Sequence, residues 1–141
     1  MAHRVREVMT AQPVALDEKA SVVEAARAMR DGDFGAVIVV KEVGGAVCGV
    51  ITDRDIAIRV VAEGVEPQKV TLGDICQGDV VTVGPDESAD KVGELMRDKA
   101  IRRVPVVEDG RLVGIVSLGD LAKAMDEGHA LADISAAPPN R

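Results

Sequence analysis

Two pairs of a hydroxyl and a carboxyl side chain recur in this sequence with the same spacing. Thr52 stands three residues before Asp55, and Ser117 stands three residues before Asp120. Each pair follows an apolar run and precedes a helical pattern, which is the spacing of a helix N-cap with an acid at its third position. Adjacent arginines, Arg102-Arg103, open a further apolar run. Strands of this kind are normally buried, so two neighbouring cations need a reason.

The elements that position these residues are two predicted β-hairpins, each followed by a helix. The first hairpin covers residues 35–40 and 46–51 around the turn Gly44-Gly45, and the second covers residues 102–107 and 112–117 around Asp109-Gly110. A helix with an apolar stripe is predicted ahead of the first hairpin, with Ser21 as N-cap and Glu24 completing a capping box. Short strands are predicted at residues 13–16 and 81–83, each after a helical turn.

The second half of the chain repeats the first. Ser21 and Ser88, and likewise Met29 and Met96, are 67 residues apart, while Thr52 and Ser117 are 65 apart because the second hairpin is shorter. Matched caps and turns at constant spacing indicate two copies of one βαββα unit, so the predicted fold class is α/β (α+β) with two pseudo-symmetric repeats. We expect repeat 1 over residues 1–64, a linker over 65–71, repeat 2 over 72–127 and a flexible tail over 128–141.

Composition excludes several classes of function. The chain has 141 residues, a formal net charge of −7 and a single aromatic residue, which argues against nucleic acid as a partner. No run is long enough to span a membrane and no apolar signal region is present, so a cytoplasmic protein is expected. His3 and His129 are too few for a metal cluster or a nucleophile triad, and Cys48 and Cys76 are expected to be reduced thiols. We therefore predict no catalytic residues, no metal and no enzyme.

The segment from Ile56 to Ala62 is apolar on nearly every side. A helix of this composition is covered on more than one face. We expect part of the cover to come from the other repeat and the rest from a second copy of the chain, which predicts a homodimer.

The repeated unit resembles a tandem cystathionine-β-synthase (CBS) domain pair, the Bateman module. The resemblance rests on residues 49–55 and 114–120 at matching places in the two repeats, and on Arg-Arg-Val-Pro-Val-Val before the second. It covers residues 4 to 127 and is closest to small stand-alone bacterial members of the hypoxic-response-protein type, which carry a similar Thr-Asp-Arg-Asp-Ile segment.

The resemblance implies a ligand cleft between the repeats, with two sites for AMP, ADP, ATP or S-adenosylmethionine. In such modules the aspartate binds ribose hydroxyls, the Ser/Thr assists at ribose or phosphate, strand ends enclose adenine and basic residues reach phosphate. The site of the second repeat, called the Ser117 site, would then comprise Val81, Thr82, Arg102, Arg103, Val104, Pro105, Ser117 and Asp120. The site of the first repeat, called the Thr52 site, would comprise Val14, Ala15, Val37, Thr52, Arg54 and Asp55.

The two predicted sites differ in charge. Gly35-Ala36 stands in the first repeat where Arg102-Arg103 stands in the second. We therefore expect the Ser117 site to hold a nucleotide more tightly, with Arg54 and Arg59 as partial substitutes in the Thr52 site. Two simpler interpretations remain: the hydroxyl–carboxyl pairs serve only as helix caps, and the two arginines pair with acids such as Asp98 or Glu108.

The expected function is a regulatory sensor that binds an adenosyl ligand, requires no cofactor and signals in trans to an effector protein. One alternative is a ligand-free structural or stress-response interaction protein, a homodimeric adaptor in which the motifs remain as caps. A diverged enzyme is a weaker alternative, because the sequence offers no placed histidine, metal cluster or reactive thiol.

Overall fold

The computed structural model describes residues 3–42, 45–76 and 80–125. The chain divides into two compact units, and this division does not follow the repeats of the sequence. The Thr52 unit runs from Val14 to Val80, and the Ser117 unit combines Met1–Pro13 with Val81–Arg141. The tail expected over residues 128–141, with His129, lies outside the described residues.

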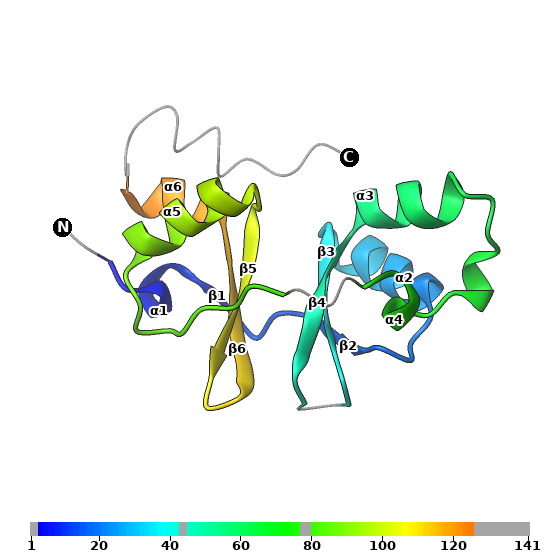
Figure 1. Ribbon diagram of the computed structural model, residues 1–141, viewed down its shortest axis with the longest axis horizontal. Helices are drawn as coiled ribbons and strands as arrows, with labels where there is room; N and C mark the ends of the chain where they lie inside the picture. The colour runs from blue at the N-terminus through cyan, green and yellow to red at the C-terminus, as the bar shows by residue number, and fades with distance from the viewer. Residues whose placement is uncertain (1–2, 43–44, 77–79, 126–141) are drawn as a thin grey trace. The chain divides into compact units, whose positions relative to one another are not determined.

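A three-stranded sheet forms the centre of the Thr52 unit (Figure 1). Its order is β2-β3-β4, with β2 parallel and β4 antiparallel to β3. The strands are β2 (Ala15–Asp17), β3 (Ala36–Val40) and β4 (Val47–Thr52). The helices are α2 (Val22–Gly32), α3 (Asp53–Ile56), a π-helix (Ala57–Val61), a 3-10 helix (Pro67–Lys69) and α4 (Leu72–Ile75). A buried apolar core joins sheet and helices through Val22, Ala25, Val37, Val39, Ile51, Val60 and Leu72.

The Ser117 unit is built on a second three-stranded sheet, of order β1-β6-β5 and antiparallel throughout. Its strands are β1 (Thr10–Ala11), β5 (Arg103–Glu108) and β6 (Arg111–Ser117). Its helices are α1 (Val5–Val8), α5 (Ala89–Lys99) and α6 (Leu118–Met125), and α5 and α6 lie beside each other (Figure 1). The core of this unit contains Val5, Val83, Val92, Met96, Val104, Val106, Val116 and Leu121.

Local signals in the sequence account for the ends of these elements. The Ser21 hydroxyl accepts a hydrogen bond from the Glu24 backbone N–H at 3.2 Å, which caps α2 as predicted, but in the described residues the Glu24 side chain does not return the bond that would complete the predicted capping box. Asp109 and Gly110 both have positive φ, 51° and 77°, as a tight two-residue hairpin requires, and the predicted turn between β5 and β6 is confirmed. The mixed helix and sheet class, with two repeats, is likewise confirmed.

The short helices α1 and α4, called the leading helices, begin the first and the second repeat. Each of them packs on the repeat that it does not belong to in sequence. Val5 of α1 is fully buried with Val104 and Val116, and its N–H donates to the Glu87 carbonyl at 2.9 Å. Leu72 of α4 is fully buried in the Thr52 unit. Each compact unit therefore needs residues from both repeats.

Three elements differ from the sequence-based expectations. The segment 81–83 forms a single parallel bridge between Val83 and Val106 instead of a strand, while the two-residue strand β1 had no signal of its own. The predicted helix over residues 53–62 is α-helical only as far as Ile56, and then widens into a π-helix whose Ala62 N–H donates to the Ala57 carbonyl. Hydrophobic periodicity does not distinguish these two helix types.

The π-helix is covered on one side. Val60 is fully buried in the core of the Thr52 unit, whereas Ile58 and Val61 leave 44% and 66% of their surface exposed. Among the described residues, the apolar face from which the sequence predicted a second copy of the chain keeps Ile58 and Val61 exposed.

Candidate ligand-binding site

Ser117 and Asp120 lie at the junction where β6 ends and α6 begins. The Asp120 carboxylate accepts the Ser117 backbone N–H at 2.8 Å, and the Ser117 hydroxyl accepts the Asp120 backbone N–H at 3.0 Å. Both side chains are half-buried. The predicted N-cap is therefore present, with both of its reciprocal hydrogen bonds.

Thr52 and Asp55 repeat this arrangement where β4 meets α3. The Asp55 carboxylate accepts from the Thr52 backbone N–H at 2.8 Å and from its hydroxyl at 3.0 Å, and the Thr52 hydroxyl accepts the Asp55 N–H at 3.1 Å. Arg59 approaches the other carboxylate oxygen of Asp55 to 3.9 Å and donates to the Ile75 carbonyl at 2.9 Å. Asp55 thus has a cation beside it that Asp120 lacks in the described part of the chain.

The two arginines and the Ser117–Asp120 pair lie at the same end of the β5–β6 hairpin, opposite its turn. Arg103 is the direct cross-strand partner of Ser117, and the Arg102 carbonyl accepts the first N–H of α6, from Leu118, at 2.8 Å. The simpler interpretation of the sequence paired these arginines with acids such as Asp98 or Glu108. Instead, Glu108 binds Arg6 at 2.9 Å, and Asp98 lies 3.9 Å from Arg97. Among residues 3–42, 45–76 and 80–125, no carboxylate lies within 4.0 Å of the nitrogens of Arg102 or Arg103.

The strand register separates the other candidate residues of the Ser117 site. Val104 pairs with Val116, and both side chains are fully buried in the core. Pro105 pairs with Ile115 and, by the alternation of a strand, shares the face of Arg103 and Ser117. The segment containing Val81 and Thr82 reaches this sheet through Val83, whose N–H donates to the Pro105 carbonyl at 3.1 Å.

The candidate residues of the Thr52 site divide in the same way. Val37 pairs with Ile51 and faces the core, whereas the partner of Thr52 across the strands is Ala36. Ala15 pairs with Ile38 in the parallel pair of strands, and the preceding Val14 is exposed and accepts the Ile38 N–H at 2.9 Å. Arg54 is exposed.

One contact at the Thr52 site was not identified in the sequence. A Cβ atom placed on Gly35 would lie 3.2 Å from a carboxylate oxygen of Asp53. Gly35 does not have the positive φ of Gly64 or Gly110, so the missing side chain provides space for the carboxylate and not backbone freedom. Gly35 precedes β3 and Asp53 follows β4, and no spacing rule in the sequence predicts that two such residues lie side by side.

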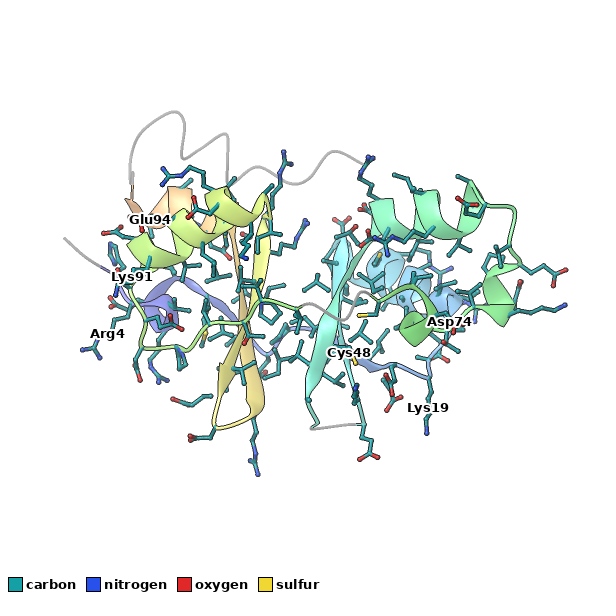
Figure 2. The ribbon with its side chains drawn as sticks, viewed as in Figure 1. Arg4, Lys19, Cys48, Asp74, Lys91 and Glu94 are labelled. Atoms are coloured by element: carbon teal, nitrogen blue, oxygen red, sulfur yellow. The ribbon has the colours of Figure 1, made fainter. Side chains whose placement is uncertain are left out.

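The two cysteines belong to the Thr52 unit and are free thiols (Figure 2, where Cys48 is labelled). Burial, and second the Glu18 carboxylate that accepts from Cys48 Sγ at 3.5 Å, raise the pKa of Cys48. Burial and the neighbouring Cys48 raise the pKa of Cys76 to about 11. High thiol pKa values disfavour the reactive thiolate. Within the described residues, no three His, Cys, Asp or Glu side chains form a group able to hold a metal ion.

Two units of related topology, each with a hydroxyl–carboxyl pair at a strand-to-helix junction, define a tandem-repeat α/β module. The chain belongs to the CBS domain family, whose sequence profile matches residues 5–62 and again residues 72–127. The resemblance in the sequence is thereby confirmed.

Known relatives extend over nearly the whole chain. CBS domain-containing protein YhcV of Bacillus subtilis is 36% identical over 135 residues, which are 93% of this chain and 94% of YhcV. Hypoxic response protein 1 of Mycobacterium tuberculosis is 33% identical over 126 residues, covering 89% and 87% of the two chains. The CBS domain pair of MJ0100, solved in complex with 5′-methylthioadenosine and S-adenosyl-L-methionine, matches with a TM-score of 0.78 at 30% identity, covering 89% of this chain and 97% of that one.

These relationships fix the general class of function. CBS pairs are regulatory ligand-binding modules, and the relatives above are named as CBS domain or hypoxic response proteins and not as enzymes. In the part of the chain that the structure describes, no helix is both long and apolar enough to cross a membrane.

Proposed function

We propose that this protein is a cytoplasmic sensor that binds an adenosyl ligand at the Ser117 site and signals to an effector protein in trans. The observation that carries the proposal is the position of Arg103 directly across the strands from Ser117, whose backbone N–H donates to the Asp120 carboxylate. Two arginines with no carboxylate within 4.0 Å in the described residues are available to an anion at this edge.

The chemistry of these groups suits an adenine nucleotide. One oxygen of the Asp120 carboxylate is occupied by the Ser117 N–H, and a carboxylate has further acceptor positions for vicinal ribose hydroxyls. Arg102 and Arg103 supply planar guanidinium groups for phosphate. MJ0100, a structural neighbour crystallised with two adenosyl compounds, supports this ligand class.

Signalling would follow from a shift of populations. A ligand that binds one conformation of the module more tightly than another shifts the equilibrium by the ratio of the two affinities. The open apolar face at Ile58 and Val61 supports the homodimer as the signalling species, since a second copy would cover it. Sedimentation velocity of the wild type and of Val61→Glu tests this part: a dimer that the substitution dissociates supports it, and a monomeric wild type contradicts it.

The second candidate is a ligand-free adaptor active under stress. It is favoured by the complete capping geometry at both junctions, which gives Asp55 and Asp120 a structural role without any ligand. The relationship to Hypoxic response protein 1 supports the link to stress.

Isothermal titration calorimetry separates the two candidates. Purified protein is titrated with AMP, ADP, ATP and S-adenosylmethionine, and the experiment is repeated with Asp120→Ala. Saturable binding of at least one compound, lost in the variant, supports the sensor. Absence of binding for all four compounds would contradict it and leave the adaptor.

A further inference from the structure

The two units use the same backbone hydrogen bond at their candidate sites but place opposite charges around it. The Asp53 N–H donates to the Gly35 carbonyl at 3.0 Å, and the Leu118 N–H donates to the Arg102 carbonyl at 2.8 Å. This bond makes Gly35 the structural equivalent of Arg102, and Asp53 the equivalent of Leu118. Where one unit has a glycine and an aspartate, the other has an arginine and a leucine.

The substitutions at this pair depend on each other. The Asp53 carboxylate lies beside Gly35, where a Cβ atom on residue 35 would be 3.2 Å from its nearer oxygen. In the other unit Leu118 is 49% exposed, and Arg102 is exposed beside it. The carboxylate in the Thr52 unit therefore occupies the position from which a cationic side chain extends in the Ser117 unit.

The remaining charges strengthen the contrast. Arg59 of the Thr52 unit is held by Asp55 and the Ile75 carbonyl, and Arg54 is exposed on the helix. A phosphate entering the Thr52 site would therefore approach the Asp53 carboxylate, whereas at the Ser117 site it would approach Arg102 and Arg103. Like charges at contact distance repel, and because the Asp53 side chain is exposed, added salt should weaken this repulsion.

We infer that the two sites select their ligands by charge, with phosphorylated adenosyl compounds at the Ser117 site and adenosyl compounds without phosphate at the Thr52 site. A neutral thioether or a cationic sulfonium at the 5′ position suits the Thr52 site, because it brings no negative charge to Asp53. This inference rests on the proposed function. It adds that one chain binds two classes of adenosyl compound at the same time, one at each site. Asp53 is the specificity-determining residue, and Gly35 makes room for it.

The test compares AMP with 5′-methylthioadenosine, which share the adenosine and differ at the 5′ group. Calorimetry on the wild type should show AMP binding that Asp120→Asn removes, and methylthioadenosine binding that Asp55→Asn removes. Asp53→Asn keeps the shape of the side chain and its hydrogen bond from the Arg54 N–H, but removes the charge. It should tighten AMP binding at the Thr52 site by about tenfold and leave methylthioadenosine binding unchanged.

The variant Gly35→Arg with Asp53→Leu exchanges the pair completely and should bind AMP at both sites. Wild-type AMP affinity at the Ser117 site should fall as salt is added, whereas methylthioadenosine affinity should not. Equal AMP affinity at the two wild-type sites, or an unchanged ligand preference in Asp53→Asn, overturns the inference and leaves the proposed function standing. If neither compound binds at either site, the proposed function fails together with the inference.

Discussion

Ser117 and Asp120 bind each other twice, at 2.8 Å through the Ser117 N–H and at 3.0 Å through the Asp120 N–H. The pair thereby caps α6 whether or not a ligand is present. Thr71 and Asp74 form the same reciprocal pair at the start of α4, at 2.9 and 3.2 Å, but Asp74 is exposed and belongs to neither candidate site (Figure 2). The chain thus contains its own control for a cap without a ligand.

Substituting Asp120 should separate capping from binding. Both Asp120→Ala and Asp74→Ala should lower the free energy of unfolding by about 1 kcal/mol, because each removes an N-terminal capping interaction. Only Asp120→Ala should also abolish the rise in melting temperature that an adenine nucleotide produces. Asp120→Asn, whose amide oxygen still accepts the Ser117 N–H, should restore stability without restoring binding. Full nucleotide binding by Asp120→Ala would reduce Asp120 to a cap.

Gly114 should not tolerate a side chain. A Cβ atom there would lie 2.9 Å from the Thr10 carbonyl oxygen and 2.5 Å from Met9 Sδ. Because the Thr10 carbonyl belongs to the backbone of β1, which pairs with β6, it cannot withdraw without breaking that pairing. We expect Gly114→Ala to cost about 1 to 3 kcal/mol in urea unfolding. Gly93→Ala, inside α5, is the matched control. Among the described residues its Cβ would meet only Leu121 of α6, at 3.8 Å, and the substitution should stabilise the protein by about 0.5 to 1 kcal/mol.

The packing of the leading helices predicts which unit each one stabilises. Val5→Ala removes a fully buried side chain from the Ser117 unit and should cost about 2 kcal/mol, and Leu72→Ala should cost about 2 to 5 kcal/mol in the Thr52 unit. Hydrogen exchange measured by mass spectrometry should show faster exchange in β5 and β6 for Val5→Ala, and in β3 and β4 for Leu72→Ala. Faster exchange of β3 and β4 in Val5→Ala would contradict this assignment.

Cys76 should make stability depend on pH above neutrality. Its pKa of about 11 in the folded protein lies above the value of about 8.5 for an unfolded thiol, so the native state holds the proton more tightly. The stabilising contribution is complete below about pH 8.5 and is lost as the pH rises through about 11. Urea unfolding across this range should show a smaller fall in unfolding free energy for Cys76→Ala than for the wild type. Identical slopes, or rapid reaction of Cys76 with a thiol reagent at neutral pH, would show that its pKa is not raised.

Local features of this fold could be predicted from the sequence because their causes are local. The hairpin turn at Asp109-Gly110 and the caps at Ser21, Thr52 and Ser117 each depend on residues within four positions of one another. The repeat itself was evident from constant spacing. The resemblance to the CBS pair, and not the strand pattern, suggested that Arg103 and Ser117 belong to one site, and the structure pairs the two residues across β5 and β6.

Features that depend on distant residues could not be predicted. The burial of Val5 with Val104 leaves no trace in hydrophobic periodicity, and neither does the contact of Asp53 with Gly35. Val37 and Val104 were expected at the ligand; the structure places both side chains in the cores, and their contact with a ligand stays a prediction. A shift of one residue along a strand reverses the face of a side chain, and the sequence pattern did not fix the register that finely.

The packing of α1 with the second repeat also affects the order in which the parts of the chain can fold during synthesis. Val5 is synthesised more than a hundred residues before Val116, its neighbour in the core. At about 5 to 20 residues per second, α1 waits roughly 5 to 20 seconds for its partners, while the Thr52 unit, which is continuous in the chain, is already fully synthesised. Although α1 is made before the whole of the Thr52 unit, it is therefore among the last of these segments to reach its position in the folded protein.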